Sequence, residues 1–222
     1  MITSNKFVVT LSALRKADAC ISGYNRLVRA LQGREFTNED DATDHYLHII
    51  YNDPISIRYI VDSNNMNDAL WALRCIDDPY NDRDIRLFIV WCARQVEYLM
   101  CDPRSKNALD MAERYANGEA TDAELYVAWT AAREVTRTIF SDATWAAVLA
   151  TSSNAVWFSV KASASASVTA RAIALAAARA IAADSATNSD AAQAWTTARN
   201  TQKNRLIEML EAGAFIGSTQ PK

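Results

Sequence analysis

The feature that most constrains this chain is an alanine-rich stretch from Ala120 to Ala198. Its centre, residues 161–183, reads KASASASVTARAIALAAARAIAA and contains neither glycine nor proline. Alanine has the highest intrinsic helix propensity because its side chain loses no rotamer freedom on folding. The stretch therefore predicts helix, and its small side chains favour the close approach of another helix.

The remaining composition favours the same fold class. The 222 residues include five glycines and four prolines, and 50% of the residues are hydrophobic. A β-sandwich or a barrel needs frequent turns rich in glycine and proline, so this composition argues against both. We expect an all-α protein, either a multi-helix bundle or stacked helical pairs, with a long alanine-rich C-terminal helical region. We further expect a helical module over residues 1–118, an alanine-rich module over 119–212 packed on it within one domain, and a flexible tail over 213–222.

Local signals place several helix ends. Asp102–Pro103 predicts the start of a helix, because proline fits the first helical turn, and Asn117–Gly118 predicts its end. Thr121 and Glu124 have the spacing of a capping box, in which each side chain satisfies a backbone N–H group of the other residue. The apolar run Ile85–Met100 predicts the central core helix of the first module.

The first sixty residues contain less regular patterns. Residues 7–32 carry a helical stripe interrupted near Ser22–Gly23, which predicts two short helices. Residues 34–44 read as an acidic loop, and we expect residues 45–52, HYLHIIYN, to form a helix that follows it. Residues 55–61, ISIRYIV, are rich in β-branched side chains and could form a strand. A single strand would have no partner in a helical chain, so we expect helix there too.

The net charge of −3 hides an asymmetry along the chain. Residues 1–136 contain 15 basic and 21 acidic side chains, whereas residues 137–222 contain 8 and 5. No basic cluster with aromatic or amide readers occurs in the sequence, so we expect no nucleic-acid partner. The sequence also contains no signal peptide and no uncharged apolar window of roughly 18 residues, so we expect a cytoplasmic protein without membrane contact.

Two acidic clusters are the first candidates for a functional site. The first cluster consists of Glu39, Asp40, Asp41 and Asp44, and the second of Asp77, Asp78, Asp82 and Asp84. The first includes the pattern DDxxD, and paired motifs of this kind hold Mg²⁺ against a diphosphate in all-α prenyl-diphosphate enzymes. Those enzymes have longer chains and carry the motifs on facing helices, whereas here both clusters read as loops or helix N-termini. We therefore favour a protein-contact role for both clusters.

The two histidines suggest a second kind of site. Asp41, His45 and His48 have i, i+4, i+7 spacing and would share one face of a helix, as a metal site requires. However, this pattern supplies only three candidate metal ligands, and we expect no metal and no cofactor. The sequence contains no GxSxG motif, no phosphate-binding glycine loop and no cysteine with a local signature of a paired base, so we expect no enzyme activity.

Six tryptophans are many for a chain of this length, and most of them read as core residues. Trp145, Trp157 and Trp195 stand among alanine and serine, where a large ring can fill a groove or contact a partner protein. These three are the aromatic candidates for a protein interface.

Four segments of the sequence, together with its tail, resemble those of a known group of proteins. They are KADAC at 16–20, NDALWALR at 67–74, DPR at 102–104 and ALDMAERYANGEAT at 108–121, followed by the alanine-rich tail. Together they resemble uncharacterised alanine-rich helical proteins of tailed phages and bacteria, which are often labelled immunity proteins. The resemblance covers most of the chain and implies no catalytic residues. In the tail, serine replaces many of the Arg, Asp and Trp residues that the resemblance implies.

From these observations we expect a non-catalytic, phage-encoded accessory factor in the host cytoplasm that inhibits a host defence protein by occupying its surface. The first alternative is an immunity protein that neutralises a toxin through a complementary charged face. The second is a Mg²⁺-dependent diphosphate-binding protein or enzyme, in which the two acidic clusters converge on one pocket. The residues required for that pocket are Asp41, Asp44, Asp78 and Asp82. A homodimer through the alanine-rich helices is compatible with all three.

The diphosphate alternative has a direct test. We expect Mg²⁺ with inorganic diphosphate to leave the melting temperature unchanged, because a ligand stabilises only a protein that binds it. A thermal-shift titration measures this. A concentration-dependent rise that requires both Mg²⁺ and diphosphate would contradict the non-catalytic expectation.

Overall fold

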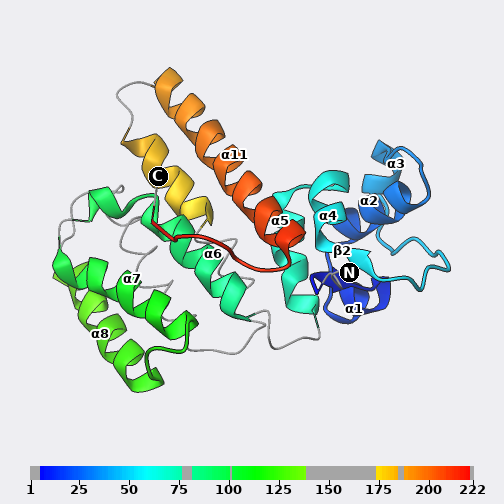
Figure 1. Cartoon of the computed structure of the whole chain (residues 1–222). Coiled ribbons are helices and arrows are strands. Elements are labelled where there is room, and N and C mark those ends of the chain that lie inside the picture. The colour runs from blue at the N-terminus through cyan, green and yellow to red at the C-terminus, as the bar shows by residue number, and fades with distance from the viewer. Residues whose placement is uncertain (1–5, 77–81, 101, 139–173, 185–187, 221–222) are drawn as a thin grey trace. The chain divides into compact units, whose positions relative to one another are not determined.

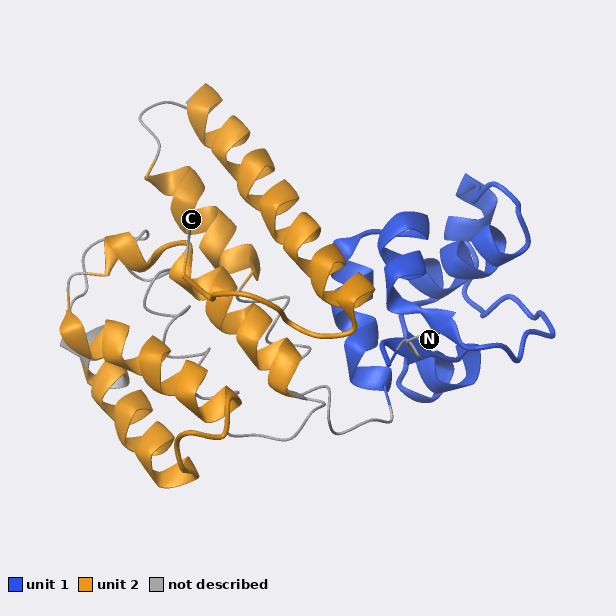
Figure 2. Cartoon of the chain, viewed as in Figure 1, with its two compact units in different colours: residues 1–78 blue, residues 79–222 orange. Residues whose placement is uncertain are grey.

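The computed structural model describes residues 6–76, 82–100, 102–138, 174–184 and 188–220 (Figure 1). Over these residues the protein is mostly helical, which confirms the all-α prediction. The chain divides into two compact units, Met1–Asp78 and Pro79–Lys222 (Figure 2). None of the described helices is long and apolar enough to cross a membrane.

Unit 1 contains short helices and one small sheet. The helices are α1 (Leu11–Lys16), α2 (Ile21–Leu31), α3 (Asn38–Asp41), α4 (Ile57–Ser63), α5 (Met66–Ala72) and the 3₁₀ turn η1 (Leu73–Cys75). Strands β1 (Val8–Val9) and β2 (Ile55–Ser56) pair in an antiparallel register, Val8 with Ser56 and Val9 with Ile55. The most deeply buried side chains of this unit include Phe7, Leu27, Val28, Ile57 and Leu70.

Two short helices are present, as predicted for residues 7–32. The interruption lies at residues 17–20, however, and not at Ser22–Gly23. Asp18 adopts a positive φ of 56° there, a conformation that a short polar side chain tolerates better than most. This residue turns the chain between α1 and α2.

The prediction of helix throughout residues 55–61 was wrong for its first two residues. Ile55–Ser56 forms β2, because a partner strand exists at Val8–Val9, where the sequence indicated no strand. Ser56 then starts α4, since its Oγ accepts the Arg58 N–H at 3.1 Å. The segment ISIRYIV is therefore a short strand that is followed directly by a helix with a serine N-cap.

Unit 2 consists of longer helices. Those described are α6 (Asp82–Arg94), the 3₁₀ turn η3 (Glu97–Leu99), α7 (Pro103–Ala116), α8 (Asp122–Thr138), a helix over 174–183 and α11 (Asn188–Ala212). The predicted ends of α7 are confirmed, because Asp102 Oδ1 accepts the Arg104 N–H at 2.8 Å and Gly118 leaves the helix at a φ of 75°. The predicted capping box of α8 is also present: the Thr121 N–H donates to Glu124, and the Glu124 N–H donates to Thr121.

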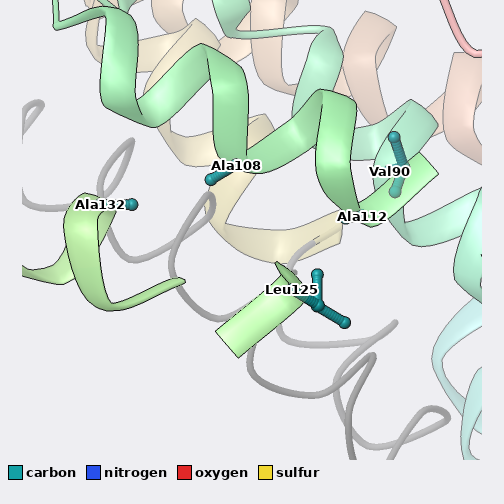
Figure 3. Close-up of a cluster of buried hydrophobic side chains, with 5 residues drawn as sticks. All are labelled: Val90, Ala108, Ala112, Leu125 and Ala132. Atoms are coloured by element: carbon teal, nitrogen blue, oxygen red, sulfur yellow. The ribbon is translucent and has the colours of Figure 1, made fainter. Parts of the chain in front are cut away.

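Helices α6, α7 and α8 share one buried cluster (Figure 3). Its members are Val90, Ala108, Ala112, Leu125 and Ala132, none of them more than 1% exposed. Three of the five are alanines, so the helix backbones approach closely. Since α7 and α8 lie on either side of residue 118, the boundary expected there falls within a shared core.

Arg94 is a buried charge at the end of α6, with 2% of its surface exposed. Its Nη1 donates to Glu97 at 2.9 Å, and its Nη2 donates to Asp110 at 2.8 Å and to Glu113 at 2.7 Å. Burial disfavours the charged form, but the three carboxylates outweigh it and raise the pKa of Arg94. The cluster ties the end of α6 to α7.

The C-terminal segment 213–220, expected to be flexible, contacts α6 and α11 within unit 2. Gly213 ends α11 at a φ of 69°. Phe215 is 5% exposed, and its N–H donates to Asp84 Oδ1 at 2.9 Å. The Arg205 guanidinium lies 4.2 Å from the Phe215 ring centroid. The contact with Asp84 joins residues 131 positions apart in the chain, so a local pattern does not reveal it.

The shared core predicts unequal effects of two substitutions in α8. Leu125 is fully buried, so Leu125→Ala should lower the free energy of unfolding by about 2–5 kcal/mol. Val127, on the same helix, is 67% exposed, and Val127→Ala should change it by less than about 0.5 kcal/mol. Urea unfolding followed by circular dichroism measures both. Equal transition midpoints for the two variants would contradict this placement of Leu125.

Candidate functional site

The first acidic cluster lies in a segment of unit 1 that contains no lysine or arginine. Residues 35–54, which we call the acidic segment, contain six carboxylates and both histidines of the chain. The segment includes α3 and ends where β2 begins. Its exposed carboxylates are Glu35, Glu39, Asp41, Asp44 and Asp53. The segment thus presents negative charge to solvent without an internal counter-charge from lysine or arginine.

Asp40 is the exception, with 6% of its surface exposed. Arg29 of α2 donates to Asp40 Oδ1 from Nη2 at 2.6 Å and from Nε at 3.0 Å. The Thr37 N–H donates to the other carboxylate oxygen at 3.0 Å, and Thr37 Oγ1 accepts the Asp40 N–H in return. The hydrogen bonds from Arg29 and Thr37 lower the pKa of Asp40 from 3.8 to about 2. This carboxylate therefore fixes α3 to α2.

The other carboxylates of the first cluster remain at the surface. Glu39 is exposed in α3, and Asp41 accepts a hydrogen bond from the Ser22 hydroxyl of α2. The Asp44 carboxylate lies 3.2 Å from His45 Nδ1, and this hydrogen bond lowers the pKa of Asp44. Glu39 and Asp44 are thus the two members that bind no other described element of unit 1, and their interface role stays a prediction.

The helix predicted for residues 45–52 was wrong. Helix α3 ends at Asp41, and residues 46–54, which we call the 46–54 loop, contain neither helix nor strand. Spacing of i, i+4 and i+7 therefore does not bring Asp41, His45 and His48 onto one helix face. Within the described residues, no three His, Cys, Asp or Glu side chains are placed to hold a metal ion.

Asn25 of α2 holds the chain where it leaves α3. The residue is 0% exposed, and its Nδ2 donates to Thr43 Oγ1 and to the His45 carbonyl, both at 3.0 Å. Its Oδ1 accepts the Leu47 N–H at 2.8 Å. Sequence reasoning missed this residue, although an asparagine within an apolar helical stripe was an available signal, because buried amides need partners.

The second acidic cluster is only partly described. Asp77 and Asp78 lie outside the described residues, as does the side chain of Asp82 at the start of α6. Asp84 is 3% exposed, accepts the Phe215 N–H, and pairs with Arg83 at 3.1 Å. Convergence of the two clusters on a diphosphate, and an interface role for the second cluster, both stay predictions.

The aromatic candidates and the cavities lie in unit 2. Trp145 and Trp157 lie outside the described residues, and Trp195 is half-buried on α11. A cavity of about 520 Å³ is lined mainly by residues of α11, both polar and apolar. A second, of about 620 Å³, borders Trp91 and the ion pair of Arg205 with Glu208. Among the described lining residues, no nucleophile is hydrogen-bonded to a general base, as covalent catalysis requires.

No family model, no curated protein and no solved structure matches this chain. The resemblance to alanine-rich proteins of phages and bacteria therefore stays a prediction. The acidic segment is the candidate functional site, because it carries exposed carboxylates and is attached to α2 by Arg29 and Asn25.

The pairing of Asp40 predicts a defined pH dependence. Because its pKa is lowered by folding, the stability it provides is fully present above about pH 4 and is lost as the pH falls towards 2. Asp40→Asn should therefore lower the urea midpoint at neutral pH, and its difference from the wild type should shrink over this acid range. Asp53→Asn, at an exposed position, is the matched control and should show little difference at any pH. A gap for Asp40→Asn that persists unchanged at pH 2 would contradict the pairing.

Proposed function

We propose that this protein is a non-catalytic binding factor that covers a basic surface of another protein with its acidic segment. One observation carries the proposal: five exposed carboxylates occur in unit 1 on a segment without lysine or arginine. A surface of one charge sign steers an oppositely charged partner and selects against others. The expected partner surface is therefore rich in lysine and arginine.

The distribution of these carboxylates supports a protein partner over a small ligand. A metal ion needs several ligands that converge on one point, whereas no group of three His, Cys, Asp or Glu side chains among the described residues could hold one. Neither of the two cavities described above includes a residue of the acidic segment. Charges spread over a segment of this length fit an extended contact with a macromolecule.

Two kinds of partner are consistent with this chemistry. The resemblance favours a phage-encoded accessory factor that blocks a host defence protein in the host cytoplasm. The acidic segment equally favours an immunity protein, because toxin neutralisation through a complementary charged face uses the same contact. In both cases the protein acts by occupying a surface and performs no chemistry of its own.

Charge reversal in the acidic segment tests the proposal. Glu39→Lys combined with Asp44→Lys reverses two exposed charges and leaves Asp40 and Asp41, which bind α2, unchanged. From a bacterial host, we expect the tagged wild type to retain one stoichiometric protein and the variant to lose about tenfold or more of it. Quantitative mass spectrometry of the eluates measures the ratio.

The matched control makes the same change in net charge in unit 2. Glu119→Lys combined with Glu211→Lys alters two exposed positions and should retain the same protein as the wild type. Equal loss in both double variants would indicate a general charge effect. That result, or full retention by the Glu39 and Asp44 variant, would overturn the proposal.

A further inference from the structure

Ile50 is the most exposed of the large apolar side chains in the described residues. It is 98% exposed, whereas the others of this kind lie between 38% and 67%. A single exposed apolar side chain is ordinary on a protein surface, so exposure alone indicates no binding site. Ile50 differs because the 46–54 loop that carries it is held at both ends and belongs to the acidic segment.

The first end of the loop is fixed by buried hydrogen bonds. Asn25 uses both N–H groups of its amide and its carbonyl oxygen to hold residues 43–47. Tyr46 adds a second attachment, because its hydroxyl donates to the Ala19 carbonyl at 2.5 Å. Its ring also packs edge-on against Tyr24, with 4.8 Å between the ring centroids. The chain therefore enters the loop in a defined position.

The other end is fixed by the small sheet. Val9 pairs with Ile55, and the Ile57 N–H donates to the Phe7 carbonyl at 2.9 Å. Ile55 and Ile57 are 2% and 0% exposed. The 46–54 loop extends between α3 and β2 from these two attachments (Figure 1). A loop held in place before binding loses less conformational entropy when it meets a partner.

The surroundings of Ile50 indicate the chemistry of that partner. Exposed carboxylates precede the loop at Glu39, Asp41 and Asp44, and Asp53 lies within it. Apolar side chains that contribute most to an interface insert into a pocket, and charged groups at the rim set the rate and choice of association. A matching site is an apolar pocket surrounded by positive charge.

We propose that the 46–54 loop is a preorganised docking element, which inserts Ile50 into an apolar pocket bordered by lysine and arginine side chains on a partner protein. Asn25 is its positioning residue: it is buried, touches no partner, and acts through the loop. This inference rests on the proposed function and specifies the contact residue and the partner chemistry.

A defined probe tests the contact. The probe is a short synthetic helical peptide with a face of leucines between rows of lysines, and the control peptide carries serine in place of leucine. In low salt, the wild-type protein binds the lysine–leucine peptide more tightly, as fluorescence anisotropy measures. Ile50→Ala lowers that affinity about 5- to 30-fold, towards the value for the control peptide. Val127→Ala, an exposed position in unit 2, leaves it unchanged.

Asn25→Leu tests the positioning role. This variant removes the three hydrogen bonds, so the Leu47 amide exchanges faster with deuterium and the peptide affinity falls about tenfold. The Ile57 amide, in the small sheet, keeps its protection and reports that unit 1 is folded. Asn25→Asp retains the acceptor for the Leu47 N–H and gives an intermediate peptide affinity. This second variant tests the positioning role if Asn25→Leu does not fold.

The outcomes separate this inference from the proposed function. If Ile50→Ala binds the lysine–leucine peptide as the wild type does while Glu39→Lys with Asp44→Lys does not, the docking loop is overturned and the charged surface stands. If neither variant changes peptide binding, both are overturned. Unchanged affinity in a folded Asn25→Leu variant whose Leu47 amide exchanges faster would overturn the positioning role.

Discussion

The acidic segment depends on two polar side chains one helical turn apart on α2. Asn25 and Arg29 lie on the same face of the helix because residues four apart are neighbours there. Arg29 holds the Asp40 carboxylate, and Asn25 holds the backbone that follows. Helix α3 has only four residues and could not persist alone, so its position is set by α2. A buried asparagine and a half-buried arginine thus hold the segment that carries the exposed charges.

The elements predicted correctly from the sequence are those defined by local chemistry. Asp102–Pro103, Asn117–Gly118 and the capping box at Thr121 each need only residues within one turn, so a pattern identifies them. The elements missed depend on contacts between distant residues: β1 meets β2 across more than forty residues, and Phe215 meets Asp84 across 131. No local pattern carries that information.

The same distinction separates the parts of the candidate site. The sequence shows that the first cluster is acidic, but not which of its carboxylates are buried. In the structure Asp40 is buried against Arg29, whereas Glu39 and Asp44 are exposed to solvent. Residues 45–52, expected to form a helix, form a loop instead, and Asn25 holds the backbone at residues 43–47 through three hydrogen bonds. Burial, rather than residue type, decides which carboxylates can reach a partner.

The alanine-rich core of unit 2 has a consequence for how such a chain can vary. A leucine core is most sensitive to truncation, but a seam built on Ala108, Ala112 and Ala132 is most sensitive to enlargement. A valine at one of these buried positions adds two methyl groups to a contact built on small side chains, and overpacking of this kind typically costs about 1–3 kcal/mol. We therefore expect substitutions at these three sites to favour the small residues glycine, alanine and serine. Exposed positions on the same helices can accept a wider range of side chains.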